Sequence, residues 1–162
     1  MFKQPGKNYI SNDRVMTPPL LAKRLYDCLP ISGTVLEPAR GDGAFYDVMP
    51  SCCRDWCEID QGRDFFEYSK KVDWIVTNPP WSKIRHFLIH SMELANHVAF
   101  LCTLNHLWTT ARQRDIKDFG FAIEKMILCD RPEGWPQSGF QHGMFLLSKN
   151  YSGDCKITYL RY

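Results

Sequence analysis

The sequence predicts an α/β fold with a mostly parallel sheet and an antiparallel C-terminal hairpin. Over the first two-thirds of the chain, short apolar runs alternate with segments of helical periodicity. That alternation is typical of parallel strands joined by crossover helices. Two β-like runs, 121–130 and 143–149, then follow with no helical pattern between them, so we expect them to pair.

Three segments are expected to be helical. Segment 17–30 has proline in its first turn and leucines at helical spacing. Segment 82–97 carries apolar residues on neighbouring helical faces, and 109–120 is a charged helix that ends in glycine. These helices separate the runs that we expect to form strands.

The strands are expected at short apolar or β-branched runs. They are placed at the start of 32–49, which continues into a glycine turn and a short helix, and at 53–60, 72–77, 97–104, 121–130, 143–149 and 155–162, the last as an edge strand. Only nineteen residues separate Glu58 from Asn78, too few for a full helix and a further full strand. We therefore expect one abbreviated edge of the sheet.

The composition is that of one folded domain over residues 1–162. Of these residues, 44% are hydrophobic and 14% aromatic, which excludes a disordered chain. The formal charge of +2 permits a nucleic-acid partner without requiring one. The first residues lack the apolar segment of a signal peptide, and no run approaches the roughly 18 apolar residues of a membrane span. We expect a cytoplasmic protein without a membrane partner.

Metal chemistry is not expected. The seven cysteines form no regular framework, and several lie in apolar runs, as reduced buried thiols do. Cys53 and Cys57 have a spacing compatible with zinc, but no second ligand pair follows. His86 and His90 lie one helical turn apart, without an acidic partner to complete a site.

A glycine turn follows the first expected strand in the segment EPARGDGAF. Glu37 and Pro38 stand at the strand end, and Gly41 and Gly43 let the backbone turn tightly and approach a ligand closely. The segment lacks the Gly-Lys-Ser/Thr of a phosphate loop and the third glycine of a dinucleotide site. A carboxylate here would repel a pyrophosphate but suits a cationic ligand such as S-adenosylmethionine, which carries a sulfonium and an ammonium group.

Acidic and apolar residues near the end of the next strand extend this pattern. Glu58 can accept hydrogen bonds from ribose hydroxyls, as acidic residues do in nucleotide-binding α/β folds. Ile59 can cover an adenine face, while Asp64 and Phe65 can supply an acceptor for the adenine amine and an apolar wall. An ordinary turn with solvated acids is the competing interpretation, and it explains the ordered set less well.

The segment DWIVTNPPWSK ends a strand-like run in Asn78-Pro79-Pro80-Trp81. The two prolines fix the backbone and cannot donate to a sheet ladder, so the chain leaves the strand stiffly. A rigid amide, a rigid carbonyl and a large ring thus follow one strand. The competing interpretation is a stiff strand-end turn with a core tryptophan.

EPARGDGAF resembles motif I, and TNPPW motif IV, of the amino methyltransferases, which use S-adenosylmethionine to methylate adenine N6 or cytosine N4 in nucleic acids. VMTPPLLAKRL resembles their motif X, and the order X, I, IV is similar to the gamma arrangement of DNA adenine-N6 methyltransferases, small phage-type orphan enzymes in particular. The resemblance covers roughly residues 9–104. It implies a Rossmann-like class I methyltransferase fold, S-adenosylmethionine as cofactor, and Thr17 and Phe45 as further cofactor-binding residues.

The resemblance also implies a chemistry for Asn78-Pro79-Pro80-Trp81. The Asn78 side-chain oxygen and the Pro79 carbonyl would hold both hydrogens of an adenine amine and stabilise the positive charge that develops on its nitrogen. The base must be flipped out of a duplex or already single-stranded, and Trp81 would stack on it. We expect the substrate to be adenine in DNA.

Two later segments, 105–115 and 131–143, are candidates for contact with nucleic acid. Their candidate residues are Trp108, Arg112, Arg114, Trp135 and Phe140. Arginines there could touch phosphates and the aromatic rings could touch bases. A solvated helix start and a loop tucked on the core are equally good interpretations. No separate target-recognition domain is expected, so specificity would come from loops, a homodimer or an accessory partner, or be slight.

Other functions stay open at this point. RNA adenine is chemically equivalent in such a pocket, and cytosine N4 is a further nucleic-acid target. Glutamine methyltransferases of proteins also use an Asn-Pro-Pro-aromatic motif, usually with Tyr. A non-catalytic binder would retain the fold alone, and the intact Asn78, Gly41 and Gly43 argue against it.

Overall fold

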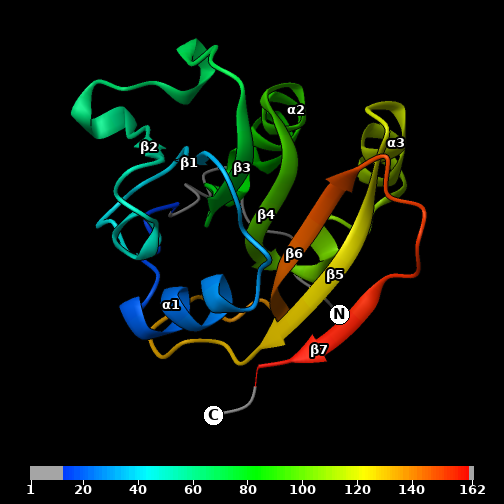
Figure 1. The fold of residues 1–162 in the computed structure, drawn as a ribbon. Helices are drawn as coiled ribbons and strands as arrows, with labels where there is room; N and C mark the ends of the chain where they lie inside the picture. The colour runs from blue at the N-terminus through cyan, green and yellow to red at the C-terminus, as the bar shows by residue number, and fades with distance from the viewer. Residues whose placement is uncertain (1–12, 161–162) are drawn as a thin grey trace, which may run out of the picture.

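The computed structural model describes residues 13–160, which form a seven-stranded sheet in the order β2-β1-β3-β4-β6-β5-β7 (Figure 1). The strands are β1 (Val35–Glu37), β2 (Arg54–Trp56), β3 (Val72–Thr77), β4 (Ala95–Thr103), β5 (Phe121–Cys129), β6 (His142–Lys149) and β7 (Lys156–Tyr159). The α-helices are α1 (Pro19–Asp27), α2 (Ile84–Leu94) and α3 (Thr110–Asp118). Single 3-10 turns are η1 (Tyr46–Val48), η2 (Ile59–Gln61), η3 (Phe65–Glu67), η4 (Trp81–Lys83) and η5 (Leu104–His106).

The strand directions bring several loops to one edge of the sheet. β1 pairs in parallel with β2 and β3, and β3 with β4, so the carboxyl ends of these four strands share an edge. β6 is antiparallel to β4 and β5, and β7 lies parallel to β5 at the far edge. Because Thr103 pairs with His142, the loop before β6 opens onto the same edge as the ends of β1–β4.

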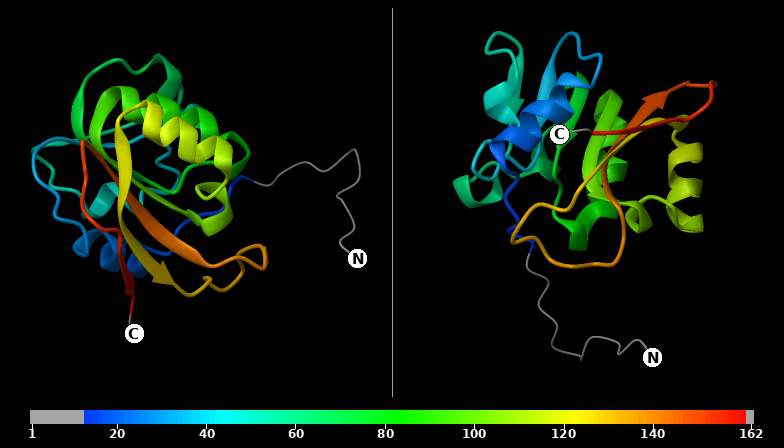
Figure 2. Two further views of the ribbon diagram at one scale, coloured as in Figure 1. Left: turned by 90° about the vertical axis from the view of Figure 1, so that its right-hand side faces the viewer. Right: turned by 90° about the horizontal axis from the view of Figure 1, so that it is seen from below.

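Helices cover both faces of the sheet (Figure 2). α2 and α3 pack on one face, where Leu88 and Ile116 are buried, and α1 covers the other face through Leu25. Strand β4 serves both layers, because alternate residues of a strand point to opposite sides: Phe100 packs with α2 and Leu101 with α1.

The predicted fold class is confirmed, with β5 and β6 as the antiparallel pair. The expected abbreviated edge is β2, which has three residues and is followed by η2 and η3 in place of a helix. Strand β7 falls within 155–162, whose last two residues lie outside the described part of the chain.

Three element boundaries differ from expectation. The short helix expected after the glycine turn is only η1, and the strand expected over 53–60 is only β2. The helix expected over 82–97 ends at Leu94, because Ala95 already pairs with Val72 of β3. Sheet pairing at Ala95 therefore overrides the helical pattern of the sequence.

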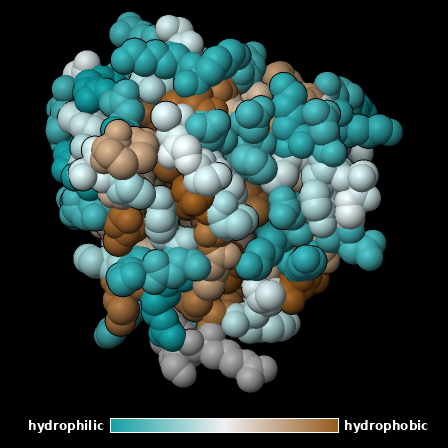
Figure 3. All heavy atoms as spheres, viewed as in Figure 1, coloured by the Kyte–Doolittle hydropathy of each residue, from teal (hydrophilic) through white to brown (hydrophobic). Residues whose placement is uncertain are grey.

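On the face seen in Figure 3, hydrophilic residues predominate and apolar ones show between them. None of the helices between residues 13 and 160 is long and apolar enough to cross a bilayer.

Candidate functional site

The glycine turn after β1 lies against the end of β2. Gly41 and Gly43 adopt positive φ of 53° and 93°, a region that glycine enters without strain. The Gly41 N–H donates to Glu58 Oε2 at 2.7 Å, and Arg40 N–H donates to the Cys57 carbonyl at 3.0 Å. A Cβ on Gly41 would come within 2.8 Å of Met16 Sδ, so the turn is closely approached from outside.

Glu37 is the buried acid of this site. Its side chain is 2% exposed, and its Oε2 has no hydrogen-bond partner among residues 13–160. Burial raises the pKa of this carboxyl well above its usual value, although the Tyr46 backbone N–H and the Arg40 guanidinium act in the opposite direction. A hydrogen-bond acceptor is thus held in a place where a buried polar group ordinarily has a partner.

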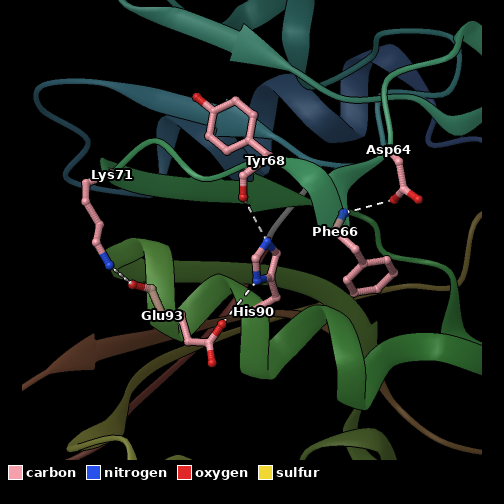
Figure 4. A network of polar contacts seen from close by, with 6 residues as sticks. All are labelled: Asp64, Phe66, Tyr68, Lys71, His90 and Glu93. Atoms are coloured by element: carbon pink, nitrogen blue, oxygen red, sulfur yellow. Dashed lines mark hydrogen bonds and ion pairs between the residues drawn. The ribbon is translucent and has the colours of Figure 1, made fainter.

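Residues after β2 were expected to contact the nucleoside. Glu58 lies two residues after β2 and caps η2 by accepting from the Asp60 N–H, and Ile59 beside it is 65% exposed. Asp64 caps η3 by accepting from the Phe66 N–H at 2.9 Å (Figure 4). Its carboxylate therefore already has a structural role.

Phe65 differs from expectation, because it faces the core. It is 3% exposed and packs against Phe87, with ring centroids 5.0 Å apart, and against His90. His90 also contacts the Tyr68 carbonyl and the Glu93 carboxylate (Figure 4). Glu93 is an acidic neighbour that the sequence analysis did not pair with His90, and these contacts tie α2 to the segment before β3.

The end of β3 carries the motif Asn78-Pro79-Pro80-Trp81. The Asn78 Nδ2 donates to the Val15 carbonyl at 2.9 Å, and this leaves the side-chain oxygen as the atom that can accept from another group. Pro79 is buried, and Pro80 precedes the 3-10 turn that begins at Trp81.

Trp81 lies in a cluster of rings from η5, from the loop before β6 and from the first residue of β6. Its ring centroid is 5.2 Å from that of His106, 5.7 Å from His142 and 6.2 Å from Trp135. It is half-buried and packs against both core clusters of the sheet. The two histidines of this cluster were not among the candidate site residues predicted from the sequence.

Residues 13–18, named here the N-terminal strap, cross the carboxyl edge of the sheet before α1. Asp13 accepts hydrogen bonds from the Ser82 backbone N–H at 3.1 Å and from its hydroxyl. Arg14 forms an ion pair of 2.9 Å with Asp60 of η2. The strap therefore joins the segment after β2 to the segment after β3.

The next two residues of the strap complete these contacts. The Val15 carbonyl accepts from Asn78 Nδ2, and the Met16 carbonyl accepts from Trp135 Nε1 at 3.0 Å. Val15, Met16 and Thr17 lie in the segment that resembles motif X, but only Thr17 was expected to bind a ligand. The contacts of Val15 and Met16 could not be predicted, since their partners lie far along the chain.

Two cavities border the strap. A small one, of about 30 Å³, is lined by residues of the strap, the glycine turn and the strand ends, namely Val15, Met16, Thr17, Glu37, Ala39, Arg40, Gly41, Asp42, Ala44, Phe45 and Asn78. A larger one, of about 550 Å³, lies between the strap, η1 and the loop before β6, with Asp42, Asp47 and Glu133 in its wall. The small cavity brings the predicted cofactor residues Glu37, Gly41 and Phe45 together with Asn78.

The two candidate nucleic-acid loops lie side by side. Leu104 N–H donates to the Gln141 carbonyl at 2.9 Å, which joins the loop after β4 to the loop before β6. Trp108 and Phe140, from these two loops, are 55% and 53% exposed. Both rings are therefore accessible to a ligand at this edge of the sheet.

The remaining candidates of these loops differ in exposure. Arg114 is exposed and Arg112 half-buried on α3, whose first turn Thr109 caps. Trp135 differs from the expectation of an available ring, since it is 6% exposed and packs beside Trp81. Within the described part of the chain, no three His, Cys, Asp or Glu side chains gather as metal ligands.

Solved structures with a similar fold include several proteins assigned as methyltransferases. A protein from Listeria monocytogenes assigned as a class I S-adenosylmethionine-dependent methyltransferase superposes with a TM-score of 0.66 at 14% identity, covering 95% of this chain and 68% of that one. The M protein of the type I restriction enzyme EcoKI gives 0.63 at 15% identity, covering 85% of this chain and 44% of that one. A Pyrococcus horikoshii protein assigned as an RNA methyltransferase gives 0.54 at 17% identity, covering 81% and 79%.

These similarities establish the fold as that of the class I methyltransferases. The chain spans less than half the length of the EcoKI M protein. No family model and no curated sequence matches the chain.

We predict that Glu37→Gln stabilises the fold at neutral pH by at least about 1 kcal/mol, because it removes a buried charge whose pKa is raised. A carboxyl with a raised pKa favours folding below its unfolded pKa, and that contribution is lost as pH rises through the folded pKa. The advantage of the variant should therefore be absent near pH 4, grow above the ordinary glutamate pKa, and level off once the buried group is ionised.

Thermal unfolding between pH 4 and pH 9 measures this difference. Glu67→Gln, at an exposed position of η3, is the matched control and should follow the unmodified protein. A Glu37→Gln curve parallel to the unmodified one at every pH would contradict the electrostatic account.

Proposed function

We propose that the protein transfers a methyl group from S-adenosylmethionine to the N6 amine of adenine in DNA. The observation that carries this proposal is the shared lining of the small cavity: the buried acid Glu37, the glycine turn and Asn78 meet there. A group that binds a cationic cofactor and a group that accepts from an amine thus border one space. The class I methyltransferase fold and the motif order X, I, IV, similar to the gamma arrangement, support the assignment.

The residues fit S-adenosylmethionine on two counts. The unpartnered Oε2 of Glu37 can accept from the cofactor's ammonium group, and Gly41 has no Cβ to obstruct a close approach. Met16 Sδ now stands beside Gly41, so this side chain must swing aside when a nucleoside-sized ligand enters. Met16 is 43% exposed and unbranched, so the movement requires no change in the core.

The cofactor supplies a methyl group bound to a positively charged sulfur. The Asn78 side-chain oxygen and the Pro79 carbonyl accept the two amine hydrogens, which directs the nitrogen lone pair toward that methyl. As positive charge develops on the nitrogen, the same acceptors stabilise it, and the prolines keep them in place beforehand. Trp81 stacks on the base, and the solvent-exposed rings of Trp108 and Phe140 contact the strand from which the base comes.

DNA is favoured over other acceptors by the similarity to type I restriction enzyme M proteins, while the similarity to the RNA methyltransferase keeps RNA as the nearest alternative. Specificity for a DNA sequence would then rest on these loops, on a second copy of the chain or on an accessory partner.

The direct test offers tritiated S-adenosylmethionine with duplex DNA, single-stranded DNA, RNA and a protein extract, followed by digestion and chromatography. Label in N6-methyladenine from DNA is the expected result. Label in RNA adenine would shift the substrate, and label in glutamine would refute nucleic-acid methylation. Failure to bind the cofactor at all would favour a non-catalytic binder.

We predict that Asn78→Ala lowers methyl transfer on the order of a hundredfold or more, as the loss of one preorganised catalytic hydrogen bond does. Cofactor affinity should change little, because the Asn78 oxygen is assigned to the amine. Single-turnover transfer and equilibrium binding of S-adenosylhomocysteine measure the two quantities. Asn96→Ala, at an exposed position of β4, is the control, and equal losses of rate and affinity in Asn78→Ala would contradict the assigned role.

We predict that Trp81→Ala impairs methyl transfer to duplex DNA more than to single strands. Only in a duplex must stacking on Trp81 replace the stacking that the flipped base loses inside the helix. Loss of one stacking platform corresponds to about 1–3 kcal/mol. Trp81→Phe keeps a ring and controls for packing, since Trp81 also contacts the core. Unchanged duplex rates in the alanine variant would exclude a stacking role.

A further inference from the structure

His142 has a buried nitrogen without a partner beside the proposed base-stacking ring. The residue is 3% exposed, and its Nε2 makes no hydrogen bond to any of residues 13–160. Its ring centroid lies 5.7 Å from that of Trp81 and 5.8 Å from that of Trp135. Buried side-chain nitrogens are nearly always hydrogen-bonded, and leaving one unpaired costs about 1–3 kcal/mol.

The position of His142 is fixed by the sheet. It is the first residue of β6 and pairs with Thr103 of β4 on one side and Cys129 of β5 on the other. A ring held in this way keeps its place when the loops around it move. His106, which also contacts Trp81, is on a 3-10 turn and is only half-buried, so the buried nitrogen distinguishes His142.

The surroundings of the His142 imidazole favour its neutral form. Burial lowers the pKa of His142, and the Arg131 guanidinium lowers it further. A neutral imidazole has one N–H donor and one acceptor nitrogen, so it can bond to an uncharged base without a change of charge.

The proposed base has a matching group. With both amine hydrogens held by Asn78 and Pro79, the adenine edge still presents N1 and N7, two acceptors that lie on either side of the amine. A base stacked on Trp81 carries these atoms in the plane of its ring, toward the groups that surround Trp81.

We propose that His142 is a positioning residue for the substrate, which donates a hydrogen bond from Nε2 to a ring nitrogen of the target base beside its amine. The hydrogen bond fixes the rotation of the base on Trp81, so that the amine meets Asn78. This inference rests on the proposed function and adds to it the residue that recognises the ring edge.

The test removes the acceptor nitrogen from the substrate base, and a variant protein then removes the donor. Single-stranded oligonucleotides with one target adenine, 1-deazaadenine or 7-deazaadenine are compared as methyl acceptors, by kcat and KM separately. One of the two deaza bases should reduce kcat/KM roughly tenfold or more with the unmodified protein, as expected for an unpaired buried donor. His142→Phe keeps a ring between the tryptophans and should accept that deaza base and adenine equally well.

His97→Phe is the matched control, since His97 also stacks on a tryptophan, Trp74, with ring centroids 4.3 Å apart, in the body of the sheet. This variant should discriminate as the unmodified protein does. If neither deaza base reduces transfer, or if His142→Phe discriminates in full, the inference is overturned while the proposed function stands.

The proposed function and the role of His142 can be refuted separately. No transfer to unmodified adenine in any polymer would refute the proposed function and the inference with it. If His142→Phe does not fold, the substrate arm alone decides, because equal rates on all three bases with the unmodified protein overturn the inference without any variant.

Discussion

The candidate site depends on the hydrogen bond between Asn78 and the strap. By donating to the Val15 carbonyl, Asn78 Nδ2 determines which way the amide points, and its oxygen is left for a ligand. The donor is held in turn by two prolines, and the acceptor by a strap that Asp13 and Met16 attach to Ser82 and Trp135. An amide in a solvated turn would rotate freely, whereas this one has a single orientation.

Glu37, on the other side of the same small cavity, is buried at a cost in stability. A carboxyl below the glycine turn with a raised pKa and an unpaired oxygen destabilises the fold whenever it is ionised, and nothing in the sheet requires an acid there. Such local conflicts in an otherwise well-packed core are expected where function has fixed the residue. Together, a fixed acceptor and a buried acid on one cavity are the two groups that the proposed site for a cation beside a planar amine requires.

Sequence reasoning located this site because its main signals are local. The glycine turn and the prolines are read directly from neighbouring residues, and alternating elements place both at strand ends on one edge. Burial of single aromatic residues was not predictable in this way: Phe65 was expected to line the adenine site and Trp135 to be available to a base, and both instead pack into the core. An aromatic residue in a loop carries no sign of which surface it will meet.

Contacts across long sequence separations were also beyond sequence reasoning. Trp135 reaches the Met16 carbonyl across 119 positions, and His142 reaches Trp81 because β6 inserts between β4 and β5. Neither residue forms part of a motif. The strap and the histidine beside Trp81 therefore emerge only when the order of strands is known.

The strand order also sets the electrostatic approach to the site. β1 and β4 flank β3, so the acids that follow β1, Asp42 and Asp47, and the arginines that follow β4, Arg112 and Arg114, lie on opposite sides of Asn78. On the proposed function, these arginines would attract the phosphates of a nucleic acid over the end of β4, past Trp108. On the other side the acids stand among Arg14 and Arg40, so the group that would hold a cationic cofactor there is the buried Glu37 and not a surface charge.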